Sequence, residues 1–226
     1  MSSSIRDCTD ESIFQQAIEE AVSHIRAGRC IVLPTDTVYG IGCDAFSPDA
    51  VSLLLHTKGR GRHMPPPVLI GSVDDVASLV EVIPESARDV MNAWWPGGVT
   101  IVFRANPRVS WDLGDTNGTV AIRMPRHDVA LALLQATGPL AVSSANRTGQ
   151  PSPVTAEGAF DQLGESVPLY LDGGEVGTTY QPVGADTGST IVDASDIDRG
   201  GAWRVIRRGV VDVNEIRAVA GGEWDL

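Results

Sequence analysis

Short apolar runs alternate with segments of helical periodicity along most of this chain, and no other feature limits the fold as strongly. Residues 12–27 place apolar side chains on one helical stripe, Ser12 and Gln15 fit a capping box, and Gly28 fits a helix stop. The run 30–33 follows at once, is rich in β-branched residues and ends at Pro34. Such a run is typical of a strand buried on both faces. We therefore expect a helix and then a buried strand.

The alternation continues to the C-terminus and defines the fold class. Further helices are expected from Ser47-Pro48 onward and at 74–80, 84–95, 128–137, 155–163 and 212–220. Further strands are expected at 67–70, 99–104, 119–123, 140–143, 169–171, 190–192 and 205–206. Because several strands follow one another, the pattern predicts an α/β fold with a twisted sheet of mixed parallel and antiparallel strands flanked by helices. No linker divides the chain, so we expect one domain over 1–226 with a short C-terminal tail from about 210.

The chain is acidic, with 17 basic and 29 acidic residues and a formal net charge of −12. A surface of this sign repels phosphate backbones, so strong direct binding to nucleic acid is not expected. A local basic pocket for a small anion stays compatible with this charge.

Cysteine and histidine spacing gives no sign of a metal centre. The three cysteines lack C-x-x-C spacing and the four histidines lack H-E-x-x-H spacing, so no metal ligand is assigned to protein side chains. The first ten residues lack the apolar segment of a signal peptide, and the longest uncharged apolar stretch, 129–142, is shorter than the roughly 20 residues of a membrane span. We expect a cytoplasmic protein that does not bind membranes.

The first candidate cluster is the string P-T-D-T-V-Y-G-I-G at 34–42, directly after the expected strand 30–33. Open α/β sheets place ligands at such strand ends, where hydroxyls and glycines let a ligand approach the backbone. Thr35 and Thr37 supply hydroxyl groups. Composition alone balances this reading evenly against a turn that binds nothing.

The second cluster is K-G-R-G-R-H at 58–63. Lys58 is the only lysine of the chain, since the other 16 basic residues are arginines. An ammonium and a guanidinium bind phosphate in different ways, so Lys58 with Arg60 and Arg62 suits a polyphosphate. The alternative is a solvated basic loop after a helix, where the helix dipole favours cations.

The third cluster, V-S-S-A-N-R-T-G at 142–149, again follows an expected strand. Ser144 and Asn146 point the same way if the backbone stays extended, and they would then bind sugar hydroxyls, phosphate or a base. The segment lacks the G-x-S-x-G pattern of a serine nucleophile, and an Asx or Ser turn is the alternative. Arg123, Arg207 and Ser189 lie at strand ends and are weaker candidates.

Three motifs in this order make the sequence similar to the YrdC/Sua5 family: P-T-D-T-V-Y-G at 34–40, Lys58-x-Arg60 and Ser144-x-Asn146. The likeness covers nearly the whole chain and implies a YrdC-like sheet around a concave cavity, in the short single-domain type. It implies a nucleotidyltransferase that condenses L-threonine, bicarbonate and ATP into L-threonylcarbamoyladenylate and pyrophosphate. The product would serve t6A modification of tRNA at adenosine 37, through a downstream tRNA threonylcarbamoyltransferase complex.

The resemblance also implies roles for particular residues. Lys58 and Arg60 would be the catalytic cations at the nucleotide phosphates, with Mg²⁺ beside them. The residues expected to bind ATP are Lys58, Arg60, Arg62, Thr119, Ser144, Asn146, Ser152 and Arg207. The residues expected to bind L-threonine are Thr35, Arg123 and Ser189. Gly61 and the prolines at 65–66 depart from the family pattern, which leaves the roles of Arg62 and His63 open.

Two alternatives remain beside this activity. One is a module that binds double-stranded RNA or tRNA, against which the net charge of −12 argues. The other is a related carbamoyl-transfer enzyme, of a kind that usually occurs in larger chains. The segment 172–188, rich in Gly, Thr and Asp, is long for a compact domain and is expected to be either a mobile lid or disordered.

Overall fold

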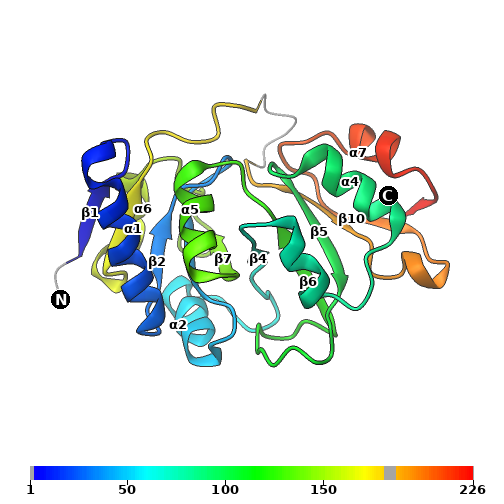
Figure 1. Ribbon diagram of the computed structural model, residues 1–226, viewed down its shortest axis with the longest axis horizontal. Helices are drawn as coiled ribbons and strands as arrows, with labels where there is room; N and C mark the ends of the chain where they lie inside the picture. The colour runs from blue at the N-terminus through cyan, green and yellow to red at the C-terminus, as the bar shows by residue number, and fades with distance from the viewer. Residues whose placement is uncertain (1–2, 181–186, 226) are drawn as a thin grey trace.

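The computed structural model describes residues 3–180 and 187–225, and one mixed sheet runs through these residues from end to end. Figure 1 shows the N-terminus and the C-terminus at opposite ends of the molecule. The order of the strands is β1-β8-β2-β3-β7-β4-β6-β5-β9-β10-β11. Their bounds are β1 Ser4–Asp7, β2 Ile31–Leu33, β3 Gly40–Asp44, β4 Val68–Leu69, β5 Val99–Arg104, β6 Thr119–Arg123, β7 Leu140–Ser144, β8 Leu169–Asp172, β9 Thr190–Asp193, β10 Trp203–Arg207 and β11 Trp224–Asp225.

Strand directions confirm the predicted mixed sheet. β8 pairs in parallel with β1 and β2, β4 with β6, β5 with β9, and β10 with β11. The antiparallel pairs are β2 with β3, β3 with β7, β4 with β7, β5 with β6, and β9 with β10. Beyond residue 210 the chain forms the helix expected at 212–220 and then the edge strand β11.

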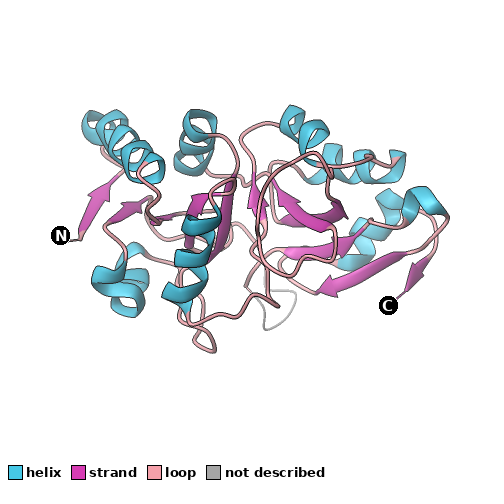
Figure 2. Cartoon of the chain, turned by 90° about the horizontal axis from the view of Figure 1, so that it is seen from below, coloured by secondary structure: helices cyan, strands magenta, loops and turns pink. Residues whose placement is uncertain are grey.

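Helices lie on both sides of this sheet (Figure 2). Their bounds are α1 Glu11–Arg26, α2 Pro48–Lys58, α3 Val76–Leu79, α4 Glu85–Trp94, α5 Asp128–Thr137, α6 Ala156–Leu163 and α7 Val213–Ala220, with short 3-10 turns at Val73–Asp75, Gly164–Ser166 and Ile197–Arg199. Because α1 and α5 pack on one face of the sheet, Ile31 and Leu33 join their core, while Val32 points into the core on the other face. This explains why β2 is an unbroken apolar run. Within the described residues, no helix is long and apolar enough to cross a membrane.

The helix that precedes β2 starts differently from the prediction. Its N-cap is Asp10, whose Oδ1 accepts from the Ser12 backbone N–H at 2.8 Å and from the Ser12 hydroxyl at 2.6 Å. The expected capping box of Ser12 and Gln15 is therefore wrong. Asp10 lies two residues before Ser12 and accepts its backbone N–H, so the helix begins earlier and Ser12 lies inside its first turn.

Three strands were not expected: β1, β3 and β11. In β3, Gly40 and Gly42 indicated a loop, but they form strand because neighbouring side chains occupy the space of their missing Cβ atoms. A Cβ on Gly40 would lie 2.6 Å from Val142 Cγ1, and one on Gly42 would lie 3.1 Å from Val142 Cγ2. The glycines therefore permit close packing of β3 on β7.

Candidate functional site

A cavity of about 360 Å³ is lined by residues of β5, β6, β7 and β9 and by the loop that follows β2. Most of the side chains predicted to bind substrates contribute to its wall. They are Thr35, Arg60, Thr119, Arg123, Ser144, Ser152, Ser189 and Arg207. Lys58, Arg62 and Asn146 are not in the described wall.

The polar side-chain groups in the described part of this wall are donors of hydrogen bonds or positive charges, and none is acidic. Its polar side chains are hydroxyls and arginines, and no Asp or Glu side chain belongs to the described wall. In a chain of net charge −12, a hollow without carboxylates and with three guanidinium groups favours an anionic ligand.

Lys58 is the last residue of α2, and Gly59 ends that helix in the left-handed conformation with φ of 62°. Its ammonium group donates to the backbone oxygens of Ser144 and Asn146, the latter at 2.7 Å, and to Asn146 Oδ1 at 3.4 Å. The side chain is buried. Lys58 therefore lies behind the wall and holds the end of β7, which brings Lys58, Ser144 and Asn146 together.

The charge of Lys58 has no acidic partner among the described residues, since its ammonium group donates to neutral oxygens there. Burial, and next the nearby charge of Arg60, lower the pKa of Lys58 to about 8. An anion bound nearby would reverse this shift, because it would stabilise the charged form.

Arg60 lies in the wall itself. Its Nη1 donates to Ser143 Oγ at 2.7 Å, and its buried Nε has no hydrogen-bond partner among the described residues. Burial, and next the charge of Arg207, lower the pKa of Arg60. Two arginines held close together without a carboxylate between them form a binding site for a multiply charged anion.

Arg62 takes a different position from Arg60. It is exposed, donates from Nη2 to Asp112 Oδ1 at 2.7 Å, and has Asp115 Oδ1 3.8 Å from its Nε. Its charge is thus already balanced by two carboxylates at the surface. This placement does not favour the predicted role of Arg62 at the ATP phosphates.

The turn after β2 is tied together by the Thr35 hydroxyl. This group donates to Val38 O at 2.6 Å and accepts from the backbone N–H groups of Thr37 and Val38 at 3.2 Å each. Thr35 lines the cavity, and its hydroxyl also fixes the loop that carries Asp36 and Thr37.

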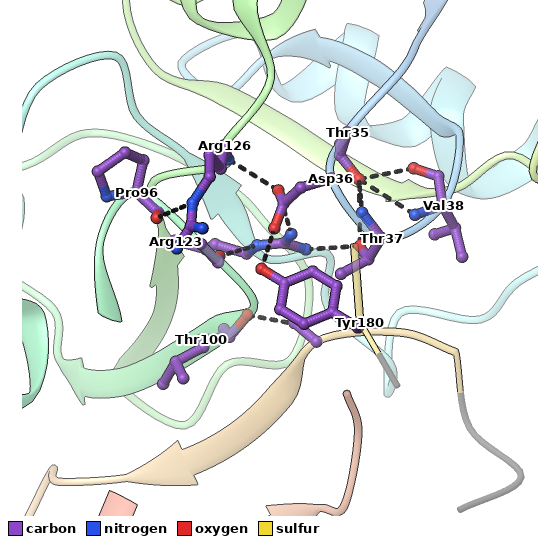
Figure 3. A network of polar contacts seen from close by, with 12 residues as sticks. Thr35, Asp36, Thr37, Val38, Pro96, Thr100, Arg123, Arg126 and Tyr180 are labelled. Atoms are coloured by element: carbon purple, nitrogen blue, oxygen red, sulfur yellow. Dashed lines mark hydrogen bonds and ion pairs between the residues drawn. The ribbon is translucent and has the colours of Figure 1, made fainter. Parts of the chain in front are cut away.

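Arg123, the last residue of β6, is buried in the centre of a polar network (Figure 3). It donates to Gly97 O at 2.8 Å, to Thr37 Oγ1 at 3.0 Å and to Asp36 Oδ1 at 2.6 Å. Burial alone raises the pKa of Asp36, but Arg123, the Tyr180 hydroxyl and the Arg126 backbone N–H outweigh burial and lower it overall. Asp36 is therefore ionised and forms a buried ion pair with Arg123.

Hydroxyl groups cover the wall near β9 and β10. Ser189 Oγ lies 2.7 Å from Thr100 Oγ1, and Arg207 donates to Ser189 O at 2.7 Å. Thr119 donates its hydroxyl to Thr116 O at 2.8 Å. These contacts orient the predicted residues Ser189, Thr119 and Arg207 around the cavity.

Sequence reasoning gave no separate role to several residues of this site. Ser143 lines the cavity, and Asp36 and Tyr180 hold its arginine. Asp36 stood inside a quoted motif, but its partners are 87 and 144 residues away in the chain. No short-range pattern could have found them. The predicted lid at 172–188 includes residues 181–186, which lie outside the described part of the chain.

The fold and the cavity define the class: an α/β protein whose mixed sheet carries a hollow with three arginines and no carboxylate in its described wall. The Sua5/YciO/YrdC family model, whose description is "Telomere recombination", matches residues 23–209. The chain belongs to this family.

Known proteins of the family resemble the chain over almost its whole length. A putative threonylcarbamoyl-AMP synthase of Mycobacterium tuberculosis is 48% identical over 95% of this chain and 94% of its own length. The threonylcarbamoyl-AMP synthase of Bacillus subtilis is 35% identical over 95% of this chain and 60% of its own length. The crystal structure of Pyrococcus abyssi Sua5 complexed with L-threonine has a TM-score of 0.81 and 32% identity, over 92% of this chain and 58% of that one. The chain thus spans little more than half of the last two proteins.

Proposed function

We propose that this protein is a threonylcarbamoyl-AMP synthase, which makes threonylcarbamoyl-AMP from L-threonine, bicarbonate and ATP. The observation that carries the proposal is a cavity with three arginines and several hydroxyls but no carboxylate in its described wall. ATP and threonine both present anionic groups to such a wall. The names of the similar proteins support the same activity, and the L-threonine in the Pyrococcus abyssi complex supports the amino acid.

The reaction needs no nucleophile from the protein. The amine of threonine combines with bicarbonate to give a carbamate and water. A carbamate oxygen then bonds to the α-phosphorus of ATP, the bond to the bridging oxygen breaks, and pyrophosphate leaves. The protein holds the reactants together and stabilises the growing negative charge by fixed electrostatics.

In our proposal, Arg60, Lys58 and Arg123 have different roles. Arg60 contacts the phosphates from the cavity wall, and Lys58 adds its buried charge while it holds Ser144 and Asn146 in place. Arg123 binds the carboxylate of threonine. Thr119, Ser144, Ser152 and Arg207 complete the ATP site, Asn146 supports it from behind the wall through Lys58, and Thr35 and Ser189 complete the threonine site.

Magnesium has no resident site of its own in this proposal. Mg²⁺ prefers carboxylate and phosphate oxygens, and the described wall offers no carboxylate. No three His, Cys, Asp or Glu side chains of the described residues gather as metal ligands. Magnesium would therefore enter as part of the substrate, bound to the phosphates of ATP.

Selectivity for threonine follows from its hydroxyl. A site that hydrogen-bonds this hydroxyl disfavours valine, because an unpaired buried polar group costs about 1–3 kcal/mol. Serine lacks only the methyl group, so it should compete better than valine. Rates measured with the three amino acids test this order.

Two other functions deserve separate tests. RNA binding predicts a gel shift with double-stranded RNA at physiological salt, which the net charge of −12 disfavours. Carbamoyl transfer predicts turnover of carbamoyl phosphate. A cytoplasmic location, a single domain and a downstream tRNA threonylcarbamoyltransferase complex stay predictions from the sequence.

Mass spectrometry of the product tests the proposed function. The protein is incubated with ATP, magnesium, L-threonine and bicarbonate, and each component is left out in turn. The proposal expects threonylcarbamoyl-AMP and pyrophosphate only in the complete mixture. Absence of the adduct, or pyrophosphate release without threonine, would falsify it.

A further inference from the structure

Asp36 is the most completely enclosed acidic group beside the cavity, with 2% of its side chain exposed. Three donors from two parts of the chain converge on it, as Figure 3 shows. Oδ1 accepts from Arg123 Nη2 at 2.6 Å and from the Arg126 backbone N–H at 2.8 Å. Oδ2 accepts from the Tyr180 hydroxyl at 2.6 Å. Asp36 itself is not part of the described cavity wall.

The hydrogen bonds of Arg123 show which of its N–H donors remain for a ligand. A guanidinium group has five N–H donors. Arg123 uses three of them: Nε on Gly97 O, one N–H of Nη1 on Thr37 Oγ1, and one N–H of Nη2 on Asp36 Oδ1. One N–H on each terminal nitrogen has no partner among the described residues, and Arg123 lines the cavity. A carboxylate has two oxygens, and one remaining donor on each terminal nitrogen is the number that it needs.

The same contacts fix the orientation of the Arg123 guanidinium group. Gly97 O, Thr37 Oγ1 and Asp36 Oδ1 hold the guanidinium at three different nitrogens, so its plane cannot turn. Of the three acceptors, Asp36 alone carries a charge. Charge-assisted bonds are roughly twice as strong as neutral ones, so Asp36 contributes most to the orientation.

Tyr180 orients Asp36 in turn. Its hydroxyl holds Oδ2, and its ring lies against the backbone next to Gly97. A Cβ on Gly98 would come within 3.0 Å of both Cζ and the hydroxyl oxygen of Tyr180. The tyrosine therefore packs on the segment that supplies the Gly97 carbonyl to Arg123.

We propose that Asp36 is a positioning residue, held by Tyr180, which aims the two remaining N–H groups of Arg123 at the carboxylate of the amino-acid substrate. The proposal rests on the proposed function, because it takes threonine as the ligand of Arg123. The proposal goes further than that function because it assigns selectivity for a free α-carboxylate to Asp36 and Tyr180, which do not touch the substrate. Loss of the Asp36 charge frees the guanidinium to turn, and the paired hydrogen bonds to the carboxylate are lost.

The test compares L-threonine with L-threoninamide, which lacks the carboxylate, by calorimetry on the full chain. Wild type, Asp36→Asn and Tyr180→Phe are compared, because Asn keeps the size of Asp36 and Phe keeps the ring of Tyr180. Asp36→Asn should weaken threonine binding roughly tenfold, as for loss of a charge-assisted hydrogen bond. Binding of threoninamide and of ATP should change less than about twofold. Tyr180→Phe should weaken threonine binding about threefold.

The matched control is Asp89→Asn, an exposed aspartate on α4, which should behave as wild type. Circular dichroism and thermal melting check the fold of each variant. A threonine-to-threoninamide affinity ratio that stays at the wild-type value in Asp36→Asn overturns the proposal. If Asp36→Asn does not fold, the same unchanged ratio in Tyr180→Phe overturns it.

The outcome also separates this proposal from the proposed function. A wild-type protein that makes threonylcarbamoyl-AMP, with variants of unchanged selectivity, contradicts only the role of Asp36. A wild-type protein that neither binds threonine nor makes the product contradicts the proposed function, and the role of Asp36 falls with it.

Discussion

Lys58 and Arg123 are the buried cations of the described structure, and they differ in how their charges are balanced. Arg123 forms an ion pair with Asp36 and is held at three nitrogens. Among the described residues, the ammonium group of Lys58 contacts neutral oxygens of Ser144 and Asn146. A paired cation gives a site a fixed geometry, whereas an unpaired one gives it net positive charge. In the proposed function, the Arg123 region therefore recognises a small carboxylate by shape and the Lys58 region attracts a polyanion by charge.

The largest effect is expected from removing the unpaired charge. Lys58→Met keeps the length of the side chain but removes its charge and its donors to Ser144 and Asn146. Because both the phosphate field and the end of β7 depend on Lys58, product formation should fall about 100-fold, or roughly 2.7 kcal/mol of transition-state stabilisation. Initial rates of pyrophosphate release measure this.

The control for that change is Arg88→Met, which removes an exposed positive charge on α4. It should leave the rate within about twofold of wild type, since screened surface charges contribute little. A folded Lys58→Met protein with nearly normal rates would remove the functional contrast between the two cations.

A smaller effect is expected from pH. The pKa of Lys58 is lowered to about 8, so its charge is present at pH 7 and mostly lost at pH 9. ATP binds the charged form better, and its affinity should therefore fall about tenfold between these values. Calorimetry at both pH values measures the change. A pH dependence of the same size in Lys58→Met would assign the titration to another group.

Stability without ATP should change with pH in the opposite direction. The pKa of Lys58 in the folded protein lies below its ordinary value of 10.5, so between about pH 8 and 10.5 the unfolded chain holds more protons. The Lys58 contribution to the free energy of unfolding should therefore rise with pH in this window. Urea unfolding of wild type and Lys58→Met isolates it as a difference, and a difference that falls with pH would contradict the shift.

The smallest effect is expected at Arg62, which belongs to neither region. Its charge is balanced at the surface by Asp112 and Asp115, so Arg62→Met should change the Michaelis constant for ATP less than about threefold. A loss close to that of Lys58→Met would show that Arg62 leaves these carboxylates and joins the phosphate site. Steady-state kinetics at varied ATP concentration distinguish the two results.

The sequence predicted the elements whose patterns are local. The strands β5 and β6 and the helix α5 have the bounds that were expected, because apolar spacing and turn residues mark them directly. β3 was missed because its glycines resemble a loop until Val142 is placed against them. Local pattern cannot show such a packing partner.

The same limit applies to the site. The resemblance selected Arg60, Ser144 and Arg123, and the structure places all three in one cavity wall. It could not show that Lys58 lies behind that wall or that Arg62 turns toward Asp112. These outcomes depend on contacts between segments 50 to 88 residues apart in the chain.

A crystal structure with ATP and L-threonine bound tests the contrast between the two regions most directly. The account predicts the threonine carboxylate within hydrogen-bond distance of Nη1 and Nη2 of Arg123, with the Asp36 contact intact, and the phosphates at Arg60 in front of Lys58. Phosphates bound at Arg123, or a threonine whose carboxylate does not contact Arg123, would contradict it.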